Sequence, residues 1–566
     1  MSSRNRGGSG RIHSGEDPGA AGNRFLHGGN VKLLEANLSI LGRRFPEIAR
    51  RVLAADPEPY IRFSSSKNGL QIVYETFGER EYPLHSTIDP SREARRLLQT
   101  AGNSGFTVVY GLGAAWHLEE FLNLNDREVL LIIDGPGRLR SFLSGRDYRK
   151  ILEHPRFKML LDPGPEELTD HLVHNYLPGL HGGFSFICLP ALSIRRRERY
   201  EQLKRAADLA LNQIRNDFSV QAHFGLLWSR NCIANLAYLQ DFPAASDYLS
   251  LFEKSIKKAI LVGAGPSLRE DRELLLRTAA DSMLIAVDTA LPFLQQLDLK
   301  PDLVVSIDSQ YYTLLHAMQP GSLDIPWAVT LSAPPALLRS LKKPFVFAGG
   351  IPLELALARK TGLPIMDTGG GNVLQAALSL ALSAGMEELT VFGVDYSQPG
   401  GIPYAPATYV DRWFRLRETR TSPFLAQSLG FTFEGRRGQE IPEYNRLYPC
   451  PRLDRYRDNM AAYLKTCSGK LKIHGVSAPL LATGSTPSSG AQALQVLPTE
   501  ETPKPSVLLR EISEELRNNA PGTVQLLYPL ISFLRKQRES SVAVTGEIIE
   551  EARSLFLKFV SLYAGE

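Results

Sequence analysis

The stretch Lys258-Ala-Ile-Leu-Val-Gly-Ala-Gly-Pro-Ser-Leu268 decides the fold of this chain. Its first half is apolar, as in a buried strand, and the segment 263–267 then turns into a helical pattern. Such a turn leaves backbone N–H groups and a helix N-terminus free to meet an anion, usually a phosphate. The fixed φ of Pro266 and the capping hydroxyl of Ser267 suit the first turn of that helix. We therefore predict a strand–turn–helix unit that binds an anion through Gly263, Gly265, Pro266 and Ser267.

This turn differs from two familiar nucleotide-binding motifs. It lacks the GxxxxGKS or GxxxxGKT pattern of a P-loop, which argues against ordinary ATPase chemistry. Leu268 stands where GxGxxG has its third glycine, so the close helix packing of a dinucleotide site is not predicted. A tight turn without a ligand remains the alternative.

From residue 259 onward, short apolar runs alternate with helical patterns. Six runs are expected to be strands: 259–263, 283–287, 303–307, 327–331, 345–348 and 389–394. Continuous apolar runs predict parallel strands covered on both faces, and doubly wound sheets bind ligands at the carboxyl ends of their strands. Asp288, Asp308 and Asp395 each follow one of these runs, so we expect them to converge with the 263–267 turn.

A second α/β pattern precedes this one. The runs 106–110 and 129–133 are strand-like and flank a helical stretch at 116–122. Gly111-Leu-Gly113 ends the first run and Asp134 the second, as in half of a Rossmann-like unit. Trp116 occupies the third glycine position, so a purely structural role is preferred for this half.

Two further helices are expected at 200–217 and 223–239, between the two α/β patterns. Trp228, Asn231 and Asn235 share one face of the second helix, and amides on such a face usually brace neighbouring loops.

The chain is too long for a single core, which predicts several domains. We predict a disordered tail at 1–24, an N-terminal Rossmann-like α/β domain at 25–222, a central domain with a doubly wound, mainly parallel sheet at 223–480, a linker at 481–506 and a C-terminal helical domain at 507–566. The tail and the linker are rich in small and polar residues, whereas the last segment has helical apolar spacing.

Composition excludes several classes of protein. Lys and Arg number 64 against 60 Asp and Glu, a formal charge of +4 that gives no electrostatic basis for a nucleic-acid binder. The four cysteines form no CxxC pair, so neither a zinc site nor a disulfide framework is predicted. No apolar segment approaches the roughly 20 residues that cross a bilayer, and no signal peptide is recognised. We expect a cytoplasmic protein that does not insert into membranes.

The strand-end residues suggest phosphate chemistry. Asp288 and Asp308 could hold a divalent cation against phosphates, or each could cap a helix or form a salt bridge; both interpretations stay open. Gln310 and His316 follow on the next loop and helix and could face the same pocket.

Two loops complete the candidate site. The loop 367–372 contains Gly370, Gly371 and Asn372, which could approach an anion or sugar and cap the next helix; a hinge without a ligand is the alternative. The Gly- and Pro-rich loop after Asp395 carries Tyr404 and Tyr409, whose hydroxyls suit phosphate or sugar, so both are substrate-loop candidates.

Together these motifs resemble the Maf family of motility-associated factors, whose central domain is similar to archaeal 6-hydroxymethylpterin pyrophosphokinases. The resemblance rests on Leu84-His-Ser86, Asp89-Pro90, Glu93, the 111–113 turn, Trp228 with Asn231 and Asn235, and the segments 263–268, 286–290, 301–310, 370–373 and 393–395.

The resemblance implies transfer of pseudaminic or legionaminic acid, both nonulosonic acids, from a CMP-activated donor onto serine or threonine of flagellin, in support of flagellar assembly. It implies a nucleotide-sugar-binding central domain in which the 263–267 turn holds CMP. It also implies that Asp288, Asp308 and Gln310 line the donor pocket or position a metal. A general base must take the acceptor proton, and His316 and Asp395 are the candidates.

The sequence departs from these relatives at two points. Residues 306–309 keep a single acid where the pyrophosphokinases carry a doubled acid for two magnesium ions. Leu374-Gln375 follows the 371–373 segment, so a polar contact that the relatives usually make there is not expected. Two alternatives remain: a diphosphate-transferring kinase acting on a pterin-like alcohol, and a flagellin-binding assembly factor without catalysis.

Overall fold

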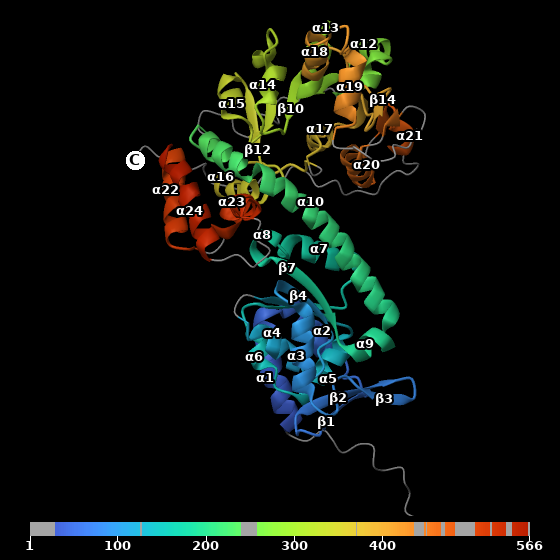
Figure 1. The fold of residues 1–566 in the computed structure, drawn as a ribbon, viewed down its shortest axis with the longest axis vertical. Coiled ribbons are helices and arrows are strands. Elements are labelled where there is room, and N and C mark those ends of the chain that lie inside the picture. The colour runs from blue at the N-terminus through green and yellow to red at the C-terminus, as the bar shows by residue number, and fades with distance from the viewer. Residues whose placement is uncertain are drawn as a thin grey trace, which may run out of the picture. The chain divides into compact units, whose positions relative to one another are not determined.

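The computed structural model describes residues 29–124, 127–238, 257–368, 371–434, 447–448, 450–465, 470–481, 504–520, 523–538 and 546–563. They form two compact units, a first unit up to Arg215 and a second unit from Asn216 (Figure 1). The boundary falls inside α10 (Arg197–Leu236), one continuous helix of 40 residues where the sequence predicted two. The predicted tail at 1–24 and residues 482–503 of the predicted linker lie outside the described residues.

The first unit contains a parallel sheet of four strands in the order β6 (Phe157–Leu161), β5 (Glu128–Ile133), β4 (Ser104–Tyr110), β7 (Gly183–Cys188). The predicted Rossmann-like strands at 106–110 and 129–133 and the helix at 116–122 are thereby confirmed. An antiparallel sheet of β1 (Ile61–Ser65), β2 (Gln71–Phe77) and β3 (Arg80–Pro83) was not predicted. The helices are α1 (Gly29–Arg44), α2 (Pro46–Ala54), α3 (Pro90–Ala101), α4 (Trp116–Leu122), α5 (Pro136–Gly145), α6 (Arg149–Leu152), α7 (Pro165–Asn175), α8 (Pro178–His181) and α9 (Pro190–Arg195).

The glycine turn after β4 is closed by a side chain of the same unit. His85 Nε2 accepts a hydrogen bond of 2.8 Å from the Ala114 N–H. A Cβ at Gly113 would lie 2.2 Å from that ring nitrogen, so the turn needs glycine for the close approach of His85. The preference for a structural role of this turn therefore has a physical basis.

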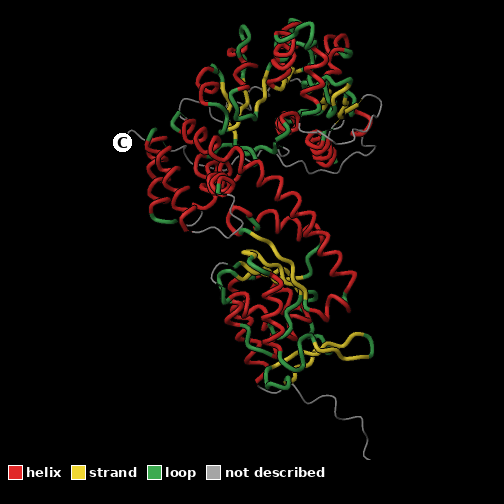
Figure 2. Tube along the Cα trace, viewed as in Figure 1, coloured by secondary structure: helices red, strands yellow, loops and turns green. Residues whose placement is uncertain are grey.

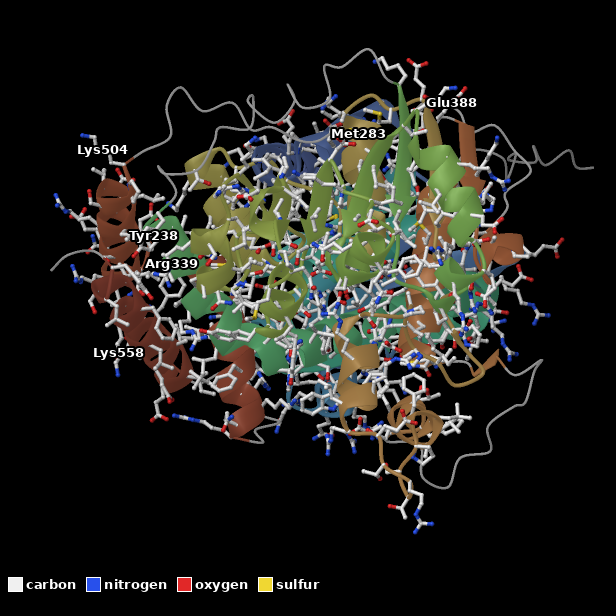
Figure 3. All side chains as sticks on the ribbon, turned by 90° about the horizontal axis from the view of Figure 1, so that it is seen from above. Tyr238, Met283, Arg339, Glu388, Lys504 and Lys558 are labelled. Carbon is white, nitrogen blue, oxygen red and sulfur yellow. The ribbon has the colours of Figure 1, made fainter. Side chains whose placement is uncertain are left out.

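The second unit is built on a parallel sheet of seven strands in the order β12 (Pro344–Phe347), β11 (Trp327–Thr330), β10 (Leu303–Ser306), β9 (Met283–Val287), β8 (Lys258–Val262), β13 (Glu388–Phe392), β16 (Lys470–Ile473). All six predicted strands are present, and β16 was missed. The strand order reverses between β8 and β13, which makes this point the topological switch of a doubly wound sheet. Met283 and Glu388 mark the first residues of β9 and β13 in Figure 3.

Helices flank this sheet (Figure 2). They are η3 (Pro266–Arg269), α12 (Arg272–Ala279), η4 (Asp288–Ala290), α13 (Leu291–Gln296), α14 (Tyr312–Ala317), η5 (Ser322–Asp324), α15 (Pro335–Ser340), α16 (Pro352–Thr361), α17 (Val373–Ser383), α18 (Tyr409–Leu416), α19 (Phe424–Thr432), α20 (Pro451–Leu464) and α21 (Ala478–Leu481), with a short pair of strands, β14 (Gln398–Pro399) and β15 (Leu447–Tyr448). The almost wholly apolar α17 packs on β8, β9 and β10. Its buried side chains form part of the hydrophobic core of the second unit.

The C-terminal helices α22 (Pro505–Arg517), α23 (Thr523–Gln537) and α24 (Gly546–Ser561) belong to the same compact unit as the seven-stranded sheet. Helix α23 packs against α16, and Lys360 Nζ lies 2.6 Å from Glu515 Oε1. The division into five segments remains a prediction.

The end of α10 braces the loops that follow β10 and β11. Asn231 Nδ2 donates to the carbonyls of Ser309 and Ser332, at 3.1 and 3.0 Å. Asn235 Nδ2 donates to the carbonyls of Leu331 and Ala333, at 2.7 and 2.9 Å. Just beyond the end of this helix, Tyr238 lies under the guanidinium of Arg339 on α15 (Figure 3). The structural interpretation of these asparagines is confirmed.

At the switch point, the turn after β8 packs directly against the turn after β13. The Gly263 and Gly265 N–H groups donate to the carbonyls of Phe392 and Gly393, at 2.8 and 3.2 Å. A Cβ at Gly265 would lie 2.5 Å from Asp395 Oδ2 and 2.6 Å from the Gly393 oxygen. The two turns therefore require glycine for their own contact, whether or not a ligand binds.

Replacing Gly265 by alanine should destabilise the second unit. The added methyl group meets a backbone oxygen and a carboxylate, and such overpacking costs about 1–3 kcal/mol. We expect a lower midpoint of thermal unfolding by differential scanning fluorimetry. Gly430→Ala is the matched control, because its Cβ enters open space in α19 and should raise the midpoint slightly. Equal midpoints for Gly265→Ala and wild type would contradict this account.

Candidate active site

Asp288 lies directly after β9 and is 4% exposed. Its Oδ2 accepts from the Ser306 hydroxyl at 2.6 Å, and its Oδ1 accepts from the Thr289 N–H at 2.6 Å and the Thr289 hydroxyl at 3.0 Å. Burial works to raise the pKa of this carboxyl, but the charge of His316 and the hydroxyl donors outweigh it, so the pKa lies below its usual value. Asp288 is therefore held as a carboxylate.

His316 faces this carboxylate from α14. Its Nδ1 lies 3.6 Å from Asp288 Oδ1, and the residue is 5% exposed. Neither ring nitrogen has a hydrogen-bond partner among the described residues. Buried polar atoms are normally paired with protein or with ordered water, so a ring nitrogen without a protein partner can bond to water or to a ligand. A carboxylate beside one nitrogen orients the ring and leaves the other nitrogen to exchange a proton.

Asp308 follows β10, the neighbour of β9 in the sheet. Its Oδ1 accepts from the Gln310 N–H at 2.9 Å. The side chain of Asp308 keeps contact with solvent. Desolvation by nearby protein atoms has the largest effect on its pKa and raises it. The hydrogen bond from the Gln310 N–H lowers the pKa, and the charge of Asp288 raises it again. The structure brings Asp288, Asp308, Gln310 and His316 to one place, as the strand order requires.

Both predicted tyrosines come to the same strand ends. The ring of Tyr409 lies 5.0 Å from that of His316 and stacks on Tyr312 at 5.8 Å. Burial raises the pKa of Tyr409 to about 12, with further contributions from neighbouring tyrosines and from Asp308 and Asp288. The hydroxyl therefore stays protonated at neutral pH and is available as a hydrogen-bond donor.

The surroundings of Tyr404 include two residues that were not identified from the sequence. Burial first of all raises the pKa of its hydroxyl, the charge of Arg452 lowers it, and Asp288, Tyr456 and Asp308 raise it again. Arg452 and Tyr456 lie one turn apart on α20 and so place a cation and a hydroxyl near Tyr404. The i, i+4 spacing alone could not connect α20 to a site formed by residues 288–316.

The glycine turn lies next to this group, because the Ala405 N–H donates to the Ala264 carbonyl at 2.9 Å. The sequence predicted that the 263–267 turn, including the Ser267 backbone, binds a phosphate. In the structure, the Ser267 N–H donates to Asp395 Oδ2 at 2.8 Å. The other oxygen of Asp395 accepts from the Val476 N–H at 2.9 Å. An anion at this turn would therefore have to displace the buried Asp395 carboxylate. Because both oxygens of Asp395 accept hydrogen bonds from backbone N–H groups, His316 is favoured over Asp395 as the base. The assignment of Gly263, Gly265, Pro266 and Ser267 to donor binding stays a prediction.

The second glycine loop is described only in part, since Gly370 lies outside the described residues. Asn372 caps α17 by accepting from the Leu374 N–H at 3.2 Å, as predicted. Its Nδ2 donates to the Tyr396 hydroxyl at 2.8 Å. A Cβ at Gly371 would lie 3.5 Å from the Tyr456 hydroxyl, which places this loop beside α20.

The ends of β11 and β12 are closed by Glu354 of α16, which is 1% exposed. Its two oxygens accept from the N–H groups of Ser332 and Gly349, at 2.8 and 2.6 Å. Burial raises the pKa of Glu354 to about 7, against the lowering effect of these hydrogen bonds. This carboxyl is a structural closure of the sheet edge and is not part of the proposed site.

Glu354 should give the second unit a pH-dependent stability. Its folded pKa of about 7 lies above the ordinary 4.5, so the folded chain retains a proton that the unfolded chain has released. This stabilisation is complete below pH 4.5 and is lost as the pH rises to about 7. We expect Glu354→Gln to flatten that decline in melting midpoint, whereas Glu273→Gln, at an exposed position of α12, should follow the wild type. Parallel profiles for Glu354→Gln and wild type would rule this out.

No group of three or more His, Cys, Asp or Glu side chains in the described ranges is placed to hold a metal ion. A cation held by Asp288 and Asp308 would therefore need further ligands, such as phosphate oxygens of a donor. None of the helices in the described part of the chain combines the length and apolar character needed to cross a membrane.

Comparison with known proteins bears on this unit. Residues 230–401 match the family model of 6-hydroxymethylpterin diphosphokinase MptE-like proteins. The MptE-like segment runs from the end of α10 through the strand ends after β8, β9 and β10 to the loop before Tyr404. The expected resemblance to the pterin enzymes is confirmed over these residues.

Three proteins of Treponema pallidum (strain Nichols), all described as uncharacterized, are also similar. They are 35% identical over 143 residues, 32% over 111 residues and 29% over 190 residues, which cover 25%, 20% and 32% of this chain. The matched stretches span 66%, 40% and 33% of the relatives' own lengths. A solved Maf glycosyltransferase from Magnetospirillum magneticum AMB-1 aligns with a TM-score of 0.48 and 15% identity, over 94% of this chain and 96% of that one.

Proposed function

We propose that the second unit is a transferase that moves a nonulosonic acid from its CMP-activated form onto a serine or threonine of flagellin. The observation that carries this proposal is the buried His316, whose ring nitrogens lack hydrogen-bond partners in the described structure while Nδ1 lies 3.6 Å from Asp288. The sequence motifs shared with the Maf family supply the donor and the acceptor.

Transfer to an alcohol requires removal of its proton as the new bond forms, and a positioned histidine is the usual base. Asp288 orients the ring and stabilises the imidazolium that forms. Its own charge is secured by Ser306 and Thr289, so the carboxylate does not take up the proton itself.

The leaving phosphate of CMP needs hydrogen-bond donors and positive charge. The protonated hydroxyls of Tyr404 and Tyr409 supply the donors, and Arg452 supplies the charge. Ser267 Oγ is buried without a partner among the described atoms and is a further donor for the nucleotide. A divalent cation at Asp288 and Asp308 remains part of the proposal, but no step depends on it.

A pterin-type diphosphokinase is the second candidate, and the MptE-like match at 230–401 favours it. The same histidine would then deprotonate a pterin alcohol that attacks ATP, and AMP would leave. The two reactions share an acceptor hydroxyl and differ in the donor. Incubation with CMP-nonulosonate and flagellin should release CMP and add the sugar mass to a serine or threonine. ATP with 6-hydroxymethylpterin should release no AMP, and the opposite result would select the kinase.

Substitution of the proposed base should slow transfer without unfolding the protein. We expect His316→Gln to lower kcat about 10²- to 10⁴-fold, the range that general base catalysis contributes, with little change in the KM for donor. The measurement is CMP release with flagellin present, together with intact mass of the product. His223→Gln, at an exposed position of α10, is the control and should retain full activity. Undiminished kcat in a folded His316→Gln protein would place the base elsewhere.

A further inference from the structure

Helix α14 has two faces of opposite character. Thr313, His316 and Ala317 are buried toward the strand ends. Tyr312 and Leu315, with Tyr311 and Met318 at the helix ends, are exposed. The helix that positions the proposed base therefore presents apolar side chains to solvent.

Helix α18 continues this exposed apolar surface. Tyr409, Arg412, Trp413 and Leu416 follow the i, i+3, i+4, i+7 spacing of one helix face. Two of them contact α14 or its C-terminal extension: Tyr409 stacks on Tyr312, and Arg412 Nη1 donates to Gln319 Oε1 at 3.3 Å. Trp413 and Leu416 lie on the same face and are exposed. We name the six exposed residues Tyr311, Tyr312, Leu315, Met318, Trp413 and Leu416 the α14/α18 patch.

Exposure of these side chains is large. Met318, Trp413 and Leu416 are 75%, 55% and 85% exposed. Scattered exposed apolar residues are common, but a contiguous group rich in Tyr, Trp and Met is typical of a protein-binding surface. Such residues provide most of the binding energy in protein interfaces.

The border of the patch is basic. Arg412 contacts Gln319, and the guanidinium of Arg417 lies 5.1 Å from the Trp413 ring, whereas Arg420 follows in the loop after α18. None of these three arginines makes an ion pair with a carboxylate in the described ranges. Of the nearby acids, Asp411 pairs with Arg415 at 2.9 Å, whereas Glu418 accepts from the Phe424 N–H at 3.1 Å and keeps its negative charge, so the arginines outnumber the acids. The free positive charges complement an acidic partner.

We propose that the α14/α18 patch is the docking surface for the protein acceptor, a polypeptide that combines apolar and acidic side chains next to its serine or threonine. The proposal rests on the proposed transfer to a protein hydroxyl. Tyr409 connects the two regions, because its ring contacts Tyr312 of the patch and His316 of the site. A polypeptide bound on the patch would present a neighbouring hydroxyl to that histidine.

The test is the triple variant Met318→Ser/Trp413→Ser/Leu416→Ser, whose positions are exposed and leave the site residues intact. With purified flagellin as acceptor, we expect KM to rise at least about tenfold, since each lost anchor weakens binding, while kcat is unchanged. Activity on a short peptide that contains the modified residue, and the KM for the CMP-sugar, should equal the wild type. Val220→Ser/Leu276→Ser, at exposed positions of α10 and α12, is the matched control. An unchanged KM for flagellin would overturn the proposal.

Binding without chemistry separates this proposal from the proposed function. Flagellin affinity is measured by biolayer interferometry without a donor. If the wild type binds flagellin and the triple variant binds at least about tenfold more weakly, the docking surface stands even when no sugar is transferred. Equal affinities, or no binding by the wild type, would overturn it. So would a wild-type dimer that the triple variant converts to a monomer in sedimentation equilibrium.

The basic border is tested by Arg417→Glu/Arg420→Glu. We expect slower association with flagellin and a weaker dependence of that rate on salt concentration, because charged border residues act mainly on encounter. An association rate equal to that of the wild type at low salt would count against an acidic partner.

Discussion

The second unit depends on one buried carboxylate at the point where its sheet reverses direction. Asp395 accepts hydrogen bonds from the Ser267 and Val476 N–H groups, and so ties the turns after β8 and β16 to the turn after β13. Buried N–H groups without partners would each cost about 1–3 kcal/mol. The close approach this requires explains why the turn after β8 has glycine at positions 263 and 265. In the first unit, His85 has the corresponding role, because its ring accepts a hydrogen bond from the Ala114 N–H in the turn after β4.

Buried side chains close the other strand ends through hydrogen bonds to backbone groups. Glu354 occupies the N–H groups after β11 and β12, and Asn231 and Asn235 occupy the carbonyls of the loops after β10 and β11. Between these closures, Asp288 follows β9, Asp308 follows β10, and His316 of α14 faces Asp288. Polar atoms committed to the fold are not available to a substrate. The proposed reactive position is therefore displaced by one or two strands from the glycine turn after β8.

Local sequence patterns predicted the strands well, because β8 to β13 are continuous apolar runs whose parallel order places their carboxyl ends together. This rule also brought Asp288, Asp308, His316 and the two tyrosines to one edge. It could not show that Asp395 satisfies backbone groups, since that depends on contacts with residues 128 positions earlier and 81 later. Strand β16 (Lys-Leu-Lys-Ile) is too short and too polar for recognition, and α23 has Pro529 in its interior. Arg452 and Tyr456 carry no signal by themselves.

Tyr409 connects the proposed base with the proposed docking surface for a large acceptor. Its ring covers His316, which is 5% exposed, and stacks at the same time on Tyr312 at the surface. Under the proposed function, the low exposure of His316 would limit the access of water to the base and so the hydrolysis of an activated donor. An acceptor docked against Tyr312 would contact the ring on which Tyr409 stacks, and Tyr409 in turn lies beside His316. The docking surface and the base would thus be linked through one aromatic side chain, and a small alcohol that makes no contact with Tyr312 would lack this link.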